Sequence, residues 1–144
     1  MIDIKFKMLT AEAVLPQKEN PEDAGIDFFT QKTKEGVVLA PGSLVTVDLG
    51  VACEFPQGFV LMFKDRSSIG ALGVHVFAGV IDSGYRGELK LVLYNTSKSV
   101  YRHMKPGSKI VQGLLLPFVS TRGVSVDELS SSKRGKGGFS STGT

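Results

Sequence analysis

The chain has 144 residues, of which 42% are hydrophobic and 22% are charged, so we expect a single soluble domain with a sizeable core. A net charge of +3 from scattered lysines and arginines argues against stable nucleic-acid binding and suits a small anionic ligand. No apolar run approaches the ~18 residues of a membrane span, and residues 1–9 lack the features of a signal peptide. We therefore expect a cytoplasmic (intracellular, soluble) protein without membrane contact.

Short apolar or alternating segments recur along the chain and predict strands. These segments are Ile2 to Met8, Leu44 to Leu49, Phe59 to Phe63, Val74 to Phe77, Leu89 to Leu93 and Ile110 to Phe118. Turn signals lie between them at Pro41-Gly42, Pro56-Gln57-Gly58, Ser83-Gly84 and Pro106-Gly107. Only residues 67–71 and 127–131 are expected to form one or two helical turns. This rhythm predicts an all-β fold, a distorted jelly roll or β-barrel.

Side chains suited to redox or metal chemistry are few. Cys53 is the single cysteine, and its place in the apolar segment 51–55 predicts a packed strand residue and not a reactive thiol. The two histidines, His75 and His103, are not at ligand spacing, and we expect both to be structural or solvated. Any metal ion is therefore expected to arrive with the substrate.

The most informative segment runs from Gly79 to Glu88 and places a carboxylate and an aromatic ring three positions apart. Asp82 ends an apolar run, Ser83-Gly84 supplies a turn, and Tyr85 precedes a strand that begins near Glu88. This pattern predicts a hairpin with Asp82 and Tyr85 at its tip or base. A carboxylate at a strand end can deprotonate a water, and a tyrosine can form a flat pocket wall, although an ordinary Asp-Ser-Gly turn has the same sequence.

Composition changes at Ser130, where a tail rich in glycine, serine and threonine begins. We therefore divide the chain into a β domain, residues 1–129, and a flexible C-terminal nucleotide-clamping arm, residues 130–144. A disordered terminus would have the same composition. However, the tail runs in order from cations to glycines, an isolated aromatic ring at Phe139 and then hydroxyl side chains. Backbone N–H groups of such a segment can bind phosphate oxygens, and Phe139 can stack on a base.

Five segments resemble, in order and spacing, the motifs of the trimeric all-β dUTPases. They are Ala24 to Phe28, Asp65 to Ser68, Gly79 to Glu88, Pro106 to Gln112 and Arg134 to Gly143, of which the third and fifth are specific and the others weak singly. The resemblance implies a homotrimer that hydrolyses dUTP to dUMP and pyrophosphate, which limits uracil incorporation into DNA and supplies dUMP for thymidylate synthesis. It also implies Mg²⁺ as cofactor, bound through the substrate phosphates and waters and not directly by side chains.

The same resemblance implies roles for individual residues. Asp82 would be the base that activates the water attacking the α-phosphorus, and Tyr85 the ring packed beneath the deoxyribose. The main chain of Gly79, Val80 and Ile81 would read the uracil edge, with a further contact from Lys90. The remaining substrate-binding residues would be Arg66, Ser67, Ser68 and Gln112 at the phosphates and, from the tail, Arg134, Phe139, Ser140, Ser141 and Thr142. Asp27 would lie near the phosphate end, as a candidate neighbour of the metal ion.

Some residues depart from the family pattern and allow a different function. Ile26 stands where an aromatic residue or leucine is usual, Asp65 where proline is frequent, and Ser68 and Ser140 where glycine is common. Ser68 also suits the related dCTP deaminases, but their glutamate base would fall at Val92, which cannot move protons. The chain could also be a non-hydrolysing nucleotide-binding or regulatory relative, or an oligonucleotide-binding β-barrel, which would need more aromatic residues than the tail offers.

Overall fold

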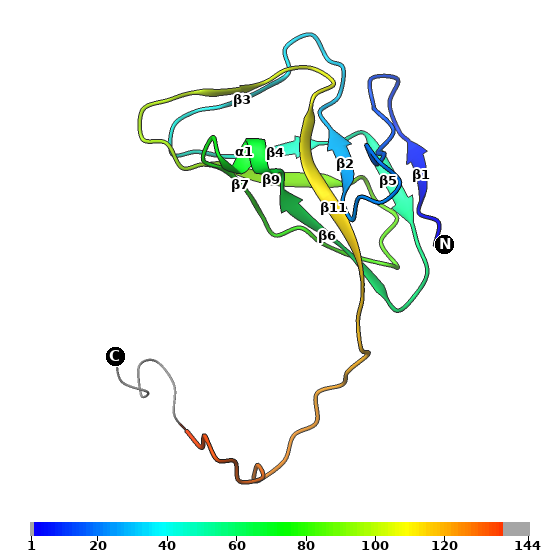
Figure 1. Ribbon diagram of the computed structural model, residues 1–144, viewed down its shortest axis with the longest axis vertical. Coiled ribbons are helices and arrows are strands. Elements are labelled where there is room, and N and C mark those ends of the chain that lie inside the picture. The colour runs from blue at the N-terminus through cyan, green and yellow to red at the C-terminus, as the bar shows by residue number, and fades with distance from the viewer. Residues whose placement is uncertain (1, 137–144) are drawn as a thin grey trace.

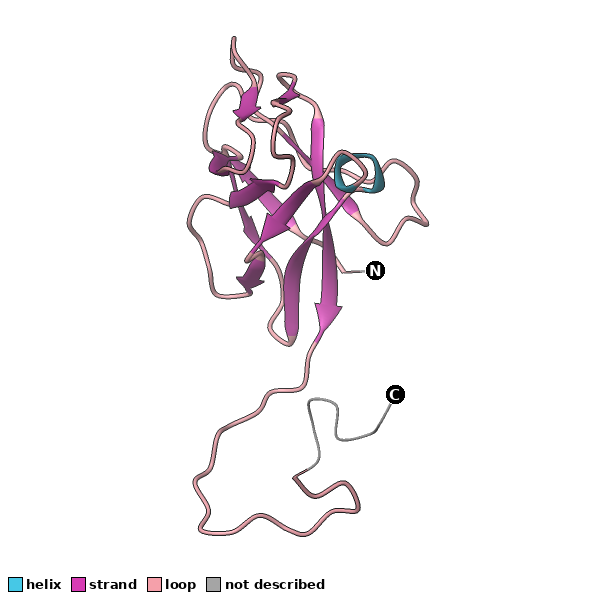
Figure 2. Ribbon diagram, turned by 90° about the vertical axis from the view of Figure 1, so that its left-hand side faces the viewer, coloured by secondary structure: helices cyan, strands magenta, loops and turns pink. Residues whose placement is uncertain are grey.

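The computed structural model describes residues 2–136, and these residues form short β-strands with one helical turn (Figures 1 and 2). The strands are β1 (Lys5–Met8), β2 (Ile26–Phe29), β3 (Val37–Leu39), β4 (Leu44–Asp48), β5 (Val51–Glu54), β6 (Phe59–Asp65), β7 (Val74–Phe77), β8 (Val80–Asp82), β9 (Lys90–Asn95), β10 (Arg102–Met104) and β11 (Lys109–Pro117). The helical turn α1 spans Ser67–Gly70, where the sequence predicted one. The predicted all-β architecture is confirmed.

The strands pair antiparallel in four small sheets, mostly with partners that are distant in sequence. The largest sheet has the order β2-β11-β6-β8, and the next has the order β4-β9-β7. Two-stranded sheets, β1-β5 and β10-β3, complete the domain. In the largest sheet β11 and β6 are central, while β8 is an edge strand with one of its two sides unpaired among the described strands.

One hydrophobic core draws side chains from both larger sheets. Along β9, Leu91 and Leu93 are buried while Val92 and Tyr94 are only half-buried, because successive strand side chains face opposite sides. In the other sheet the Phe28 and Phe63 rings pack edge to face with centroids 4.9 Å apart. A Cβ on Gly113 of β11 would lie 2.6 Å from the Phe28 ring, so only glycine lets the two strands approach this closely.

The segment Gly79 to Glu88 is not a hairpin, so that prediction is wrong. β8 pairs with β6, whereas β9 pairs with β4 and β7. The chain therefore crosses from one sheet to the other between Asp82 and Lys90. The turn at Ser83-Gly84 does form. Turn composition is a local signal, but the partner of each strand is decided by distant residues, which is why the turn could be predicted and the topology could not.

Other differences from the sequence prediction also have local causes. Strands β2, β3 and β10 were not predicted, because β3 and β10 have three residues each and β2 is buried at three of its four positions and so shows no alternation. The helical turn predicted at residues 127–131 is absent. Leu129 there is 89% exposed, and a single turn without packing contacts is not stable.

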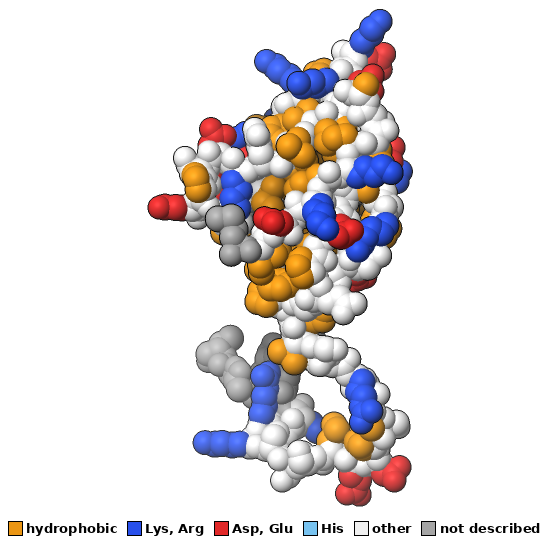
Figure 3. Space-filling model, turned by 90° about the vertical axis from the view of Figure 1, so that its right-hand side faces the viewer, with side chains coloured by type: hydrophobic (Ala, Val, Ile, Leu, Met, Phe, Trp, Pro, Cys, Tyr) orange, Lys and Arg blue, Asp and Glu red, His pale blue; other side chains and the backbone are white. Residues whose placement is uncertain are grey.

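The chain leaves the β domain after β11. The N–H of Phe118 donates to the carbonyl of Gly58 at 3.0 Å, and residues 119–136 then extend away from the domain without strand or helix (Figure 1). Figure 3 shows this segment below a domain face on the side of β1, where hydrophobic side chains are interrupted by charged ones. The division after residue 129 stays a prediction. Within residues 2–136 no helix has the length and apolar character to cross a membrane.

Candidate active site

A backbone kink directs β8 away from the sheet that contains β7. Ala78 and Gly79 both have positive φ, 60° and 92°, and such a conformation costs a non-glycine residue about 1 kcal/mol. The carbonyl of Gly79 accepts a hydrogen bond from the N–H of Phe63 at 2.8 Å, which fixes the new direction. Val80 and Asp82 are therefore presented on an exposed edge strand.

The first of two hollows lies beside this edge strand. We call it the Asp82 hollow; it has a volume of about 260 Å³ and is lined by Val80, Ile81, Asp82, Tyr85, Glu88 and Lys90. Asp82 is exposed, and no residue in the described range 2–136 bonds to its carboxylate. A carboxylate in this position can accept a hydrogen bond from a water. The structure thus brings together predicted site residues from β8, the turn and β9, and adds Glu88, which the sequence analysis did not single out.

The Tyr85 ring and the Lys90 ammonium are both fixed by neighbours. Tyr85 donates its hydroxyl hydrogen bond to the carbonyl of Glu88 at 3.0 Å, and a Cβ on Gly87 would lie 2.4 Å from that hydroxyl oxygen. Lys90 Nζ lies 2.7 Å from Asp48 Oδ1 and 3.6 Å from Glu88 Oε2. The hydrogen bond to Asp48 raises the pKa of Lys90 above its usual value, so the ammonium stays charged at neutral pH.

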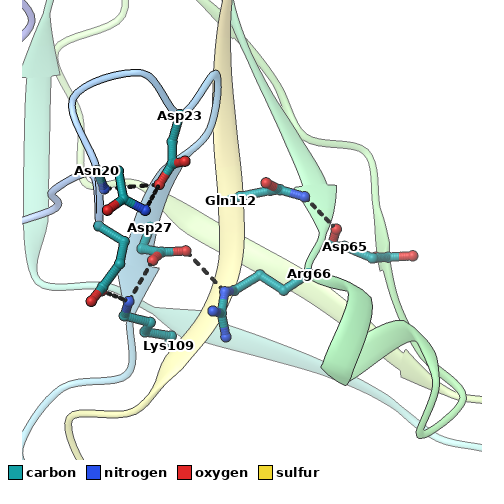
Figure 4. A network of polar contacts seen from close by, with 8 residues as sticks. Asn20, Asp23, Asp27, Asp65, Arg66, Lys109 and Gln112 are labelled. Atoms are coloured by element: carbon teal, nitrogen blue, oxygen red, sulfur yellow. Dashed lines mark hydrogen bonds and ion pairs between the residues drawn. The ribbon is translucent and has the colours of Figure 1, made fainter.

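The second hollow, which we call the Asp27 hollow, has a volume of about 430 Å³ (Figure 4). Its polar lining includes Asn20, Asp27, Arg66, Ser67, Lys109 and Gln112. Asp27 is 9% exposed, and its two oxygens contact two cations: Oδ1 accepts from Arg66 Nε at 2.9 Å, and Oδ2 lies 2.8 Å from Lys109 Nζ. One carboxylate therefore positions two cations from separate elements at the wall of one hollow.

Lys109 was not predicted as a site residue, although it lies inside the fourth motif segment. Its ammonium also contacts the carboxylate of Glu19. Hydrogen bonds to Asp27 and Glu19 raise the pKa of Lys109 above its usual value, so it remains a cation at neutral pH. Lys109 and Gln112 are three positions apart on β11, a spacing that normally places strand side chains on opposite faces. The register shift between Lys109 and Val111 lets both side chains line the same hollow, and this irregularity has no signal in the sequence.

Gln112 and the first residues of α1 complete this hollow. Gln112 Nε2 donates to the main-chain carbonyl of Asp65 at 2.9 Å. A Cβ on Gly25 would lie 2.4 Å from Gln112 Oε1, so glycine is needed beside this amide. Ser67 lines the hollow, whereas Ser68 is exposed on α1 and is not part of the lining.

Within one chain the two hollows are far apart. Asp82 lies opposite Val60 near the start of β6, and Arg66 follows Asp65 at its end. At about 3.3 Å per residue, these two positions are about 20 Å apart along the strand. Within the described residues of one chain, Asp82 therefore does not lie beside Arg66 and Ser67.

The remaining predicted residues divide into two groups. Arg134 belongs to the described part of the tail, while Phe139, Ser140, Ser141 and Thr142 lie outside the described residues.

Side chains suited to redox or metal chemistry give a separate result. Cys53 is 4% exposed on β5, so the prediction of a packed strand residue is confirmed, and burial raises its pKa to about 11. Among residues 2–136 no group of three His, Cys, Asp or Glu side chains could hold a metal ion.

Comparison with known proteins gives a consistent result. The family model for dUTPase matches residues 11–143. A deoxyuridine 5'-triphosphate nucleotidohydrolase from Thermobifida fusca is 39% identical over 99% of this chain and 79% of its own length. Another from Clostridium tetani is 36% identical over 97% of this chain and 96% of its own length.

Solved structures agree with these sequence relatives. The dUTPase of Staphylococcus bacteriophage 80alpha with dUpNHpp matches with a TM-score of 0.86 and 26% identity, over 99% of each chain. A D95N mutant dUTPase from phage phi11 of S. aureus, described with a structural Mg(II) ion, matches in fold with a TM-score of 0.78 and 22% identity, over 90% of this chain and 99% of its own. The jelly-roll-like fold predicted from the sequence is confirmed.

Proposed function

The chain belongs to the dUTPase family and is a dUTP diphosphatase, and we propose that Asp82 is the base with which it hydrolyses dUTP to dUMP and pyrophosphate. The observation that carries this assignment is the exposed Asp82 carboxylate beside the Tyr85 ring, with no bonding partner in residues 2–136. The carboxylate takes a proton from a water, whose oxygen bonds to the α-phosphorus. The bond from the α-phosphorus to the bridging oxygen then breaks and pyrophosphate leaves.

The other residues of the Asp82 hollow bind the nucleoside in this proposal. The fixed Tyr85 ring packs beneath the deoxyribose and leaves no room for a ribose 2′-hydroxyl. Main-chain groups of Gly79, Val80 and Ile81 read the uracil edge, and the support for this is that β8 is an edge strand whose outer side has no strand partner in the described range. Lys90 adds a cationic contact at the same hollow.

The Asp27 hollow binds the triphosphate in this proposal. Arg66, Ser67 and Gln112 line it, Ser68 follows on α1, and Arg66 offsets negative charge on the phosphates. The family uses a divalent metal ion, which we propose to be Mg²⁺. Both Asp27 oxygens are already engaged by cations, which fits an ion held by the substrate and not by this carboxylate. Such an ion would supply positive charge that favours departure of pyrophosphate.

The C-terminal arm closes over the bound nucleotide. Phe139 stacks on uracil, while Arg134, Ser140, Ser141 and Thr142 bind phosphate oxygens. The N–H of Phe118 bonds to Gly58 in the β domain, and Phe118 lies sixteen residues before Arg134 in the sequence. An extended chain of this length reaches about 50 Å, so the arm can serve a site on a neighbouring subunit.

We further propose a homotrimer with composite active sites. The length of about 20 Å along β6 between the position opposite Asp82 and Arg66 supports this, because one dUTP must contact Asp82 and Arg66 together. An apolar outer surface on the sheet β4-β9-β7 also supports it: Leu44 and Phe77 are 60% and 49% exposed, and the Phe77 ring lies 5.5 Å from that of Tyr94. Such a surface is commonly buried against another copy.

A mixing experiment tests the composite site. Asp82→Asn and Arg66→Gln variants should each be nearly inactive alone. If each site takes Asp82 from one subunit and Arg66 from another, refolding the two variants together in equal amounts should restore about a quarter of the wild-type activity. A site built within one chain gives no recovery, and sedimentation of each sample gives the oligomeric state.

Substrate choice tests the hydrolysis itself. Pyrophosphate release should be rapid with dUTP and far slower with UTP, dTTP and dCTP when the four are compared side by side. Binding of dUTP without release of pyrophosphate would instead identify a non-hydrolysing relative.

A further inference from the structure

Asp65 and His75 form a side-chain contact that the proposed mechanism does not use. Asp65 ends β6, and His75 lies in the middle of β7. His75 Nδ1 lies 2.7 Å from Asp65 Oδ2, and the N–H of Val76 donates to Asp65 Oδ1 at 2.7 Å. Since carboxylate oxygens accept, Nδ1 of the imidazole carries the hydrogen. Both oxygens of Asp65 are therefore bonded to β7.

The main chain of Asp65 connects directly to the residues of the Asp27 hollow. Its carbonyl accepts from Gln112 Nε2 at 2.9 Å, and the next residue is Arg66. The carbonyl of Arg66 accepts from Ile69 N at 3.0 Å and Gly70 N at 2.8 Å, which begins α1. No side chain caps α1, so the bonds of Asp65 to β7 restrain the start of this segment together with the Arg66–Asp27 ion pair and the bond from Gln112.

We propose that Asp65 and His75 form a positioning pair that holds Arg66, Ser67 and Gln112 in the geometry needed for the triphosphate. The imidazole fixes one carboxylate oxygen and so orients the other toward Val76. This fixes the end of β6 against β7. The inference rests on the proposed binding of phosphates by Arg66 and Ser67. His75 itself touches no substrate in this arrangement, so its effect passes through the strand end.

The test compares two substitutions of His75 that differ in hydrogen-bond donation. His75→Asn keeps a donor near the position of Nδ1, while His75→Leu removes it. For His75→Leu we expect the Kd of dUpNHpp to rise about tenfold while the Kd of dUMP changes less than twofold. His75→Asn should stay within about threefold of wild type for both ligands. His103, an exposed histidine on β10, supplies a matched control: His103→Leu should change neither Kd.

Further variants separate failure of the positioning pair from failure of the phosphate site. Asp65→Ala removes the acceptor for His75 and should give the same ligand pattern as His75→Leu, and combining the two should add little, because both remove the contact between Asp65 and His75. Equal effects of His75→Asn and His75→Leu, or a parallel loss of dUMP affinity, would overturn the positioning role. If both Arg66→Gln and His75→Leu leave the Kd of dUpNHpp unchanged, the proposed phosphate site is wrong. If Arg66→Gln raises this Kd but His75→Leu does not, only the positioning pair is wrong. Sedimentation confirms that every variant keeps the wild-type assembly.

Discussion

Functional groups are positioned differently in the two hollows. In the Asp82 hollow the main chain positions the carboxylate: a kink at Ala78 and Gly79 and a tight turn after Asp82 leave it exposed and without a partner in the described residues. In the Asp27 hollow side chains do it, since a carboxylate that is only 9% exposed bonds to Arg66 and Lys109. A reactive base needs an unoccupied lone pair, whereas phosphate-binding cations gain from being fixed.

This difference implies that substitutions in the two hollows should impair different properties of the protein. Changes in the Asp82 hollow should alter turnover or selectivity with little effect on folding. Changes in the Asp27 hollow should lower phosphate affinity and stability together, because breaking a partly buried ion pair leaves a charge without its partner.

Asp82→Asn should produce the largest loss of activity. The amide keeps the shape of the side chain but cannot take a proton from water, so kcat should fall by about 10² or more while nucleotide binding remains. Steady-state kinetics with dUTP and titration with dUpNHpp measure the two effects separately. Turnover close to that of the wild type would remove Asp82 from the mechanism.

Removal of residues 133–144 should produce the second largest loss of activity. Stacking of an aromatic ring on a base is worth about 1–3 kcal/mol, so kcat/KM should fall by roughly 10 to 10² while the melting temperature and the assembly stay nearly unchanged. Thermal denaturation and kinetics on the truncated protein test this. Loss of the folded assembly would make the segment structural, and unchanged hydrolysis would make it dispensable.

Asp27→Asn should weaken binding and folding together. Arg66 and Lys109 would lose their shared counter-charge, so we expect a stability loss of about 2 kcal/mol and a KM about tenfold higher. Asp48→Asn is the matched control, because it breaks the pair of Asp48 with Lys90 beside the other hollow, where both side chains are about half exposed. Exposed pairs contribute less than about 1 kcal/mol. Denaturant titration should therefore separate the two variants clearly; equal losses would contradict the distinction between the hollows.

Tyr85→Ala should have the smallest effect on dUTP hydrolysis and a selective one on UTP. The smaller side chain makes room for a ribose 2′-hydroxyl, so the ratio of kcat/KM for dUTP over UTP should fall by up to about tenfold. Tyr85→Phe keeps the ring and removes only the hydroxyl that bonds to Glu88, so it serves as the control and should retain most of the discrimination. If the ratio does not change in Tyr85→Ala, discrimination against ribose lies elsewhere.

Short-range patterns in the chain were enough to predict the family, the all-β class and most strand positions. Residues 74–77 were predicted and observed as the same strand, and α1 falls where a helical turn was expected. These features are local, because the alternation of apolar and polar residues, the turn residues and the motif spacing each depend on a few neighbouring positions of the chain. Asp82 and Tyr85 line one hollow, as their spacing of three residues predicted, whereas Lys90 joins them from β9, which belongs to the other large sheet.

The strand partners and the ion-pair network, by contrast, depend on how the whole chain folds. Asp27 lies on β2, Arg66 at the end of β6 and Lys109 on β11, and no sequence spacing relates these three positions. The contact of Asp65 with His75 likewise depends on the way β6 and β7 lie together, and β8 joins β6 and not β9 because the backbone turns at Ala78 and Gly79. Pairing between distant strands reflects the packing of the whole core, which no short stretch of sequence encodes.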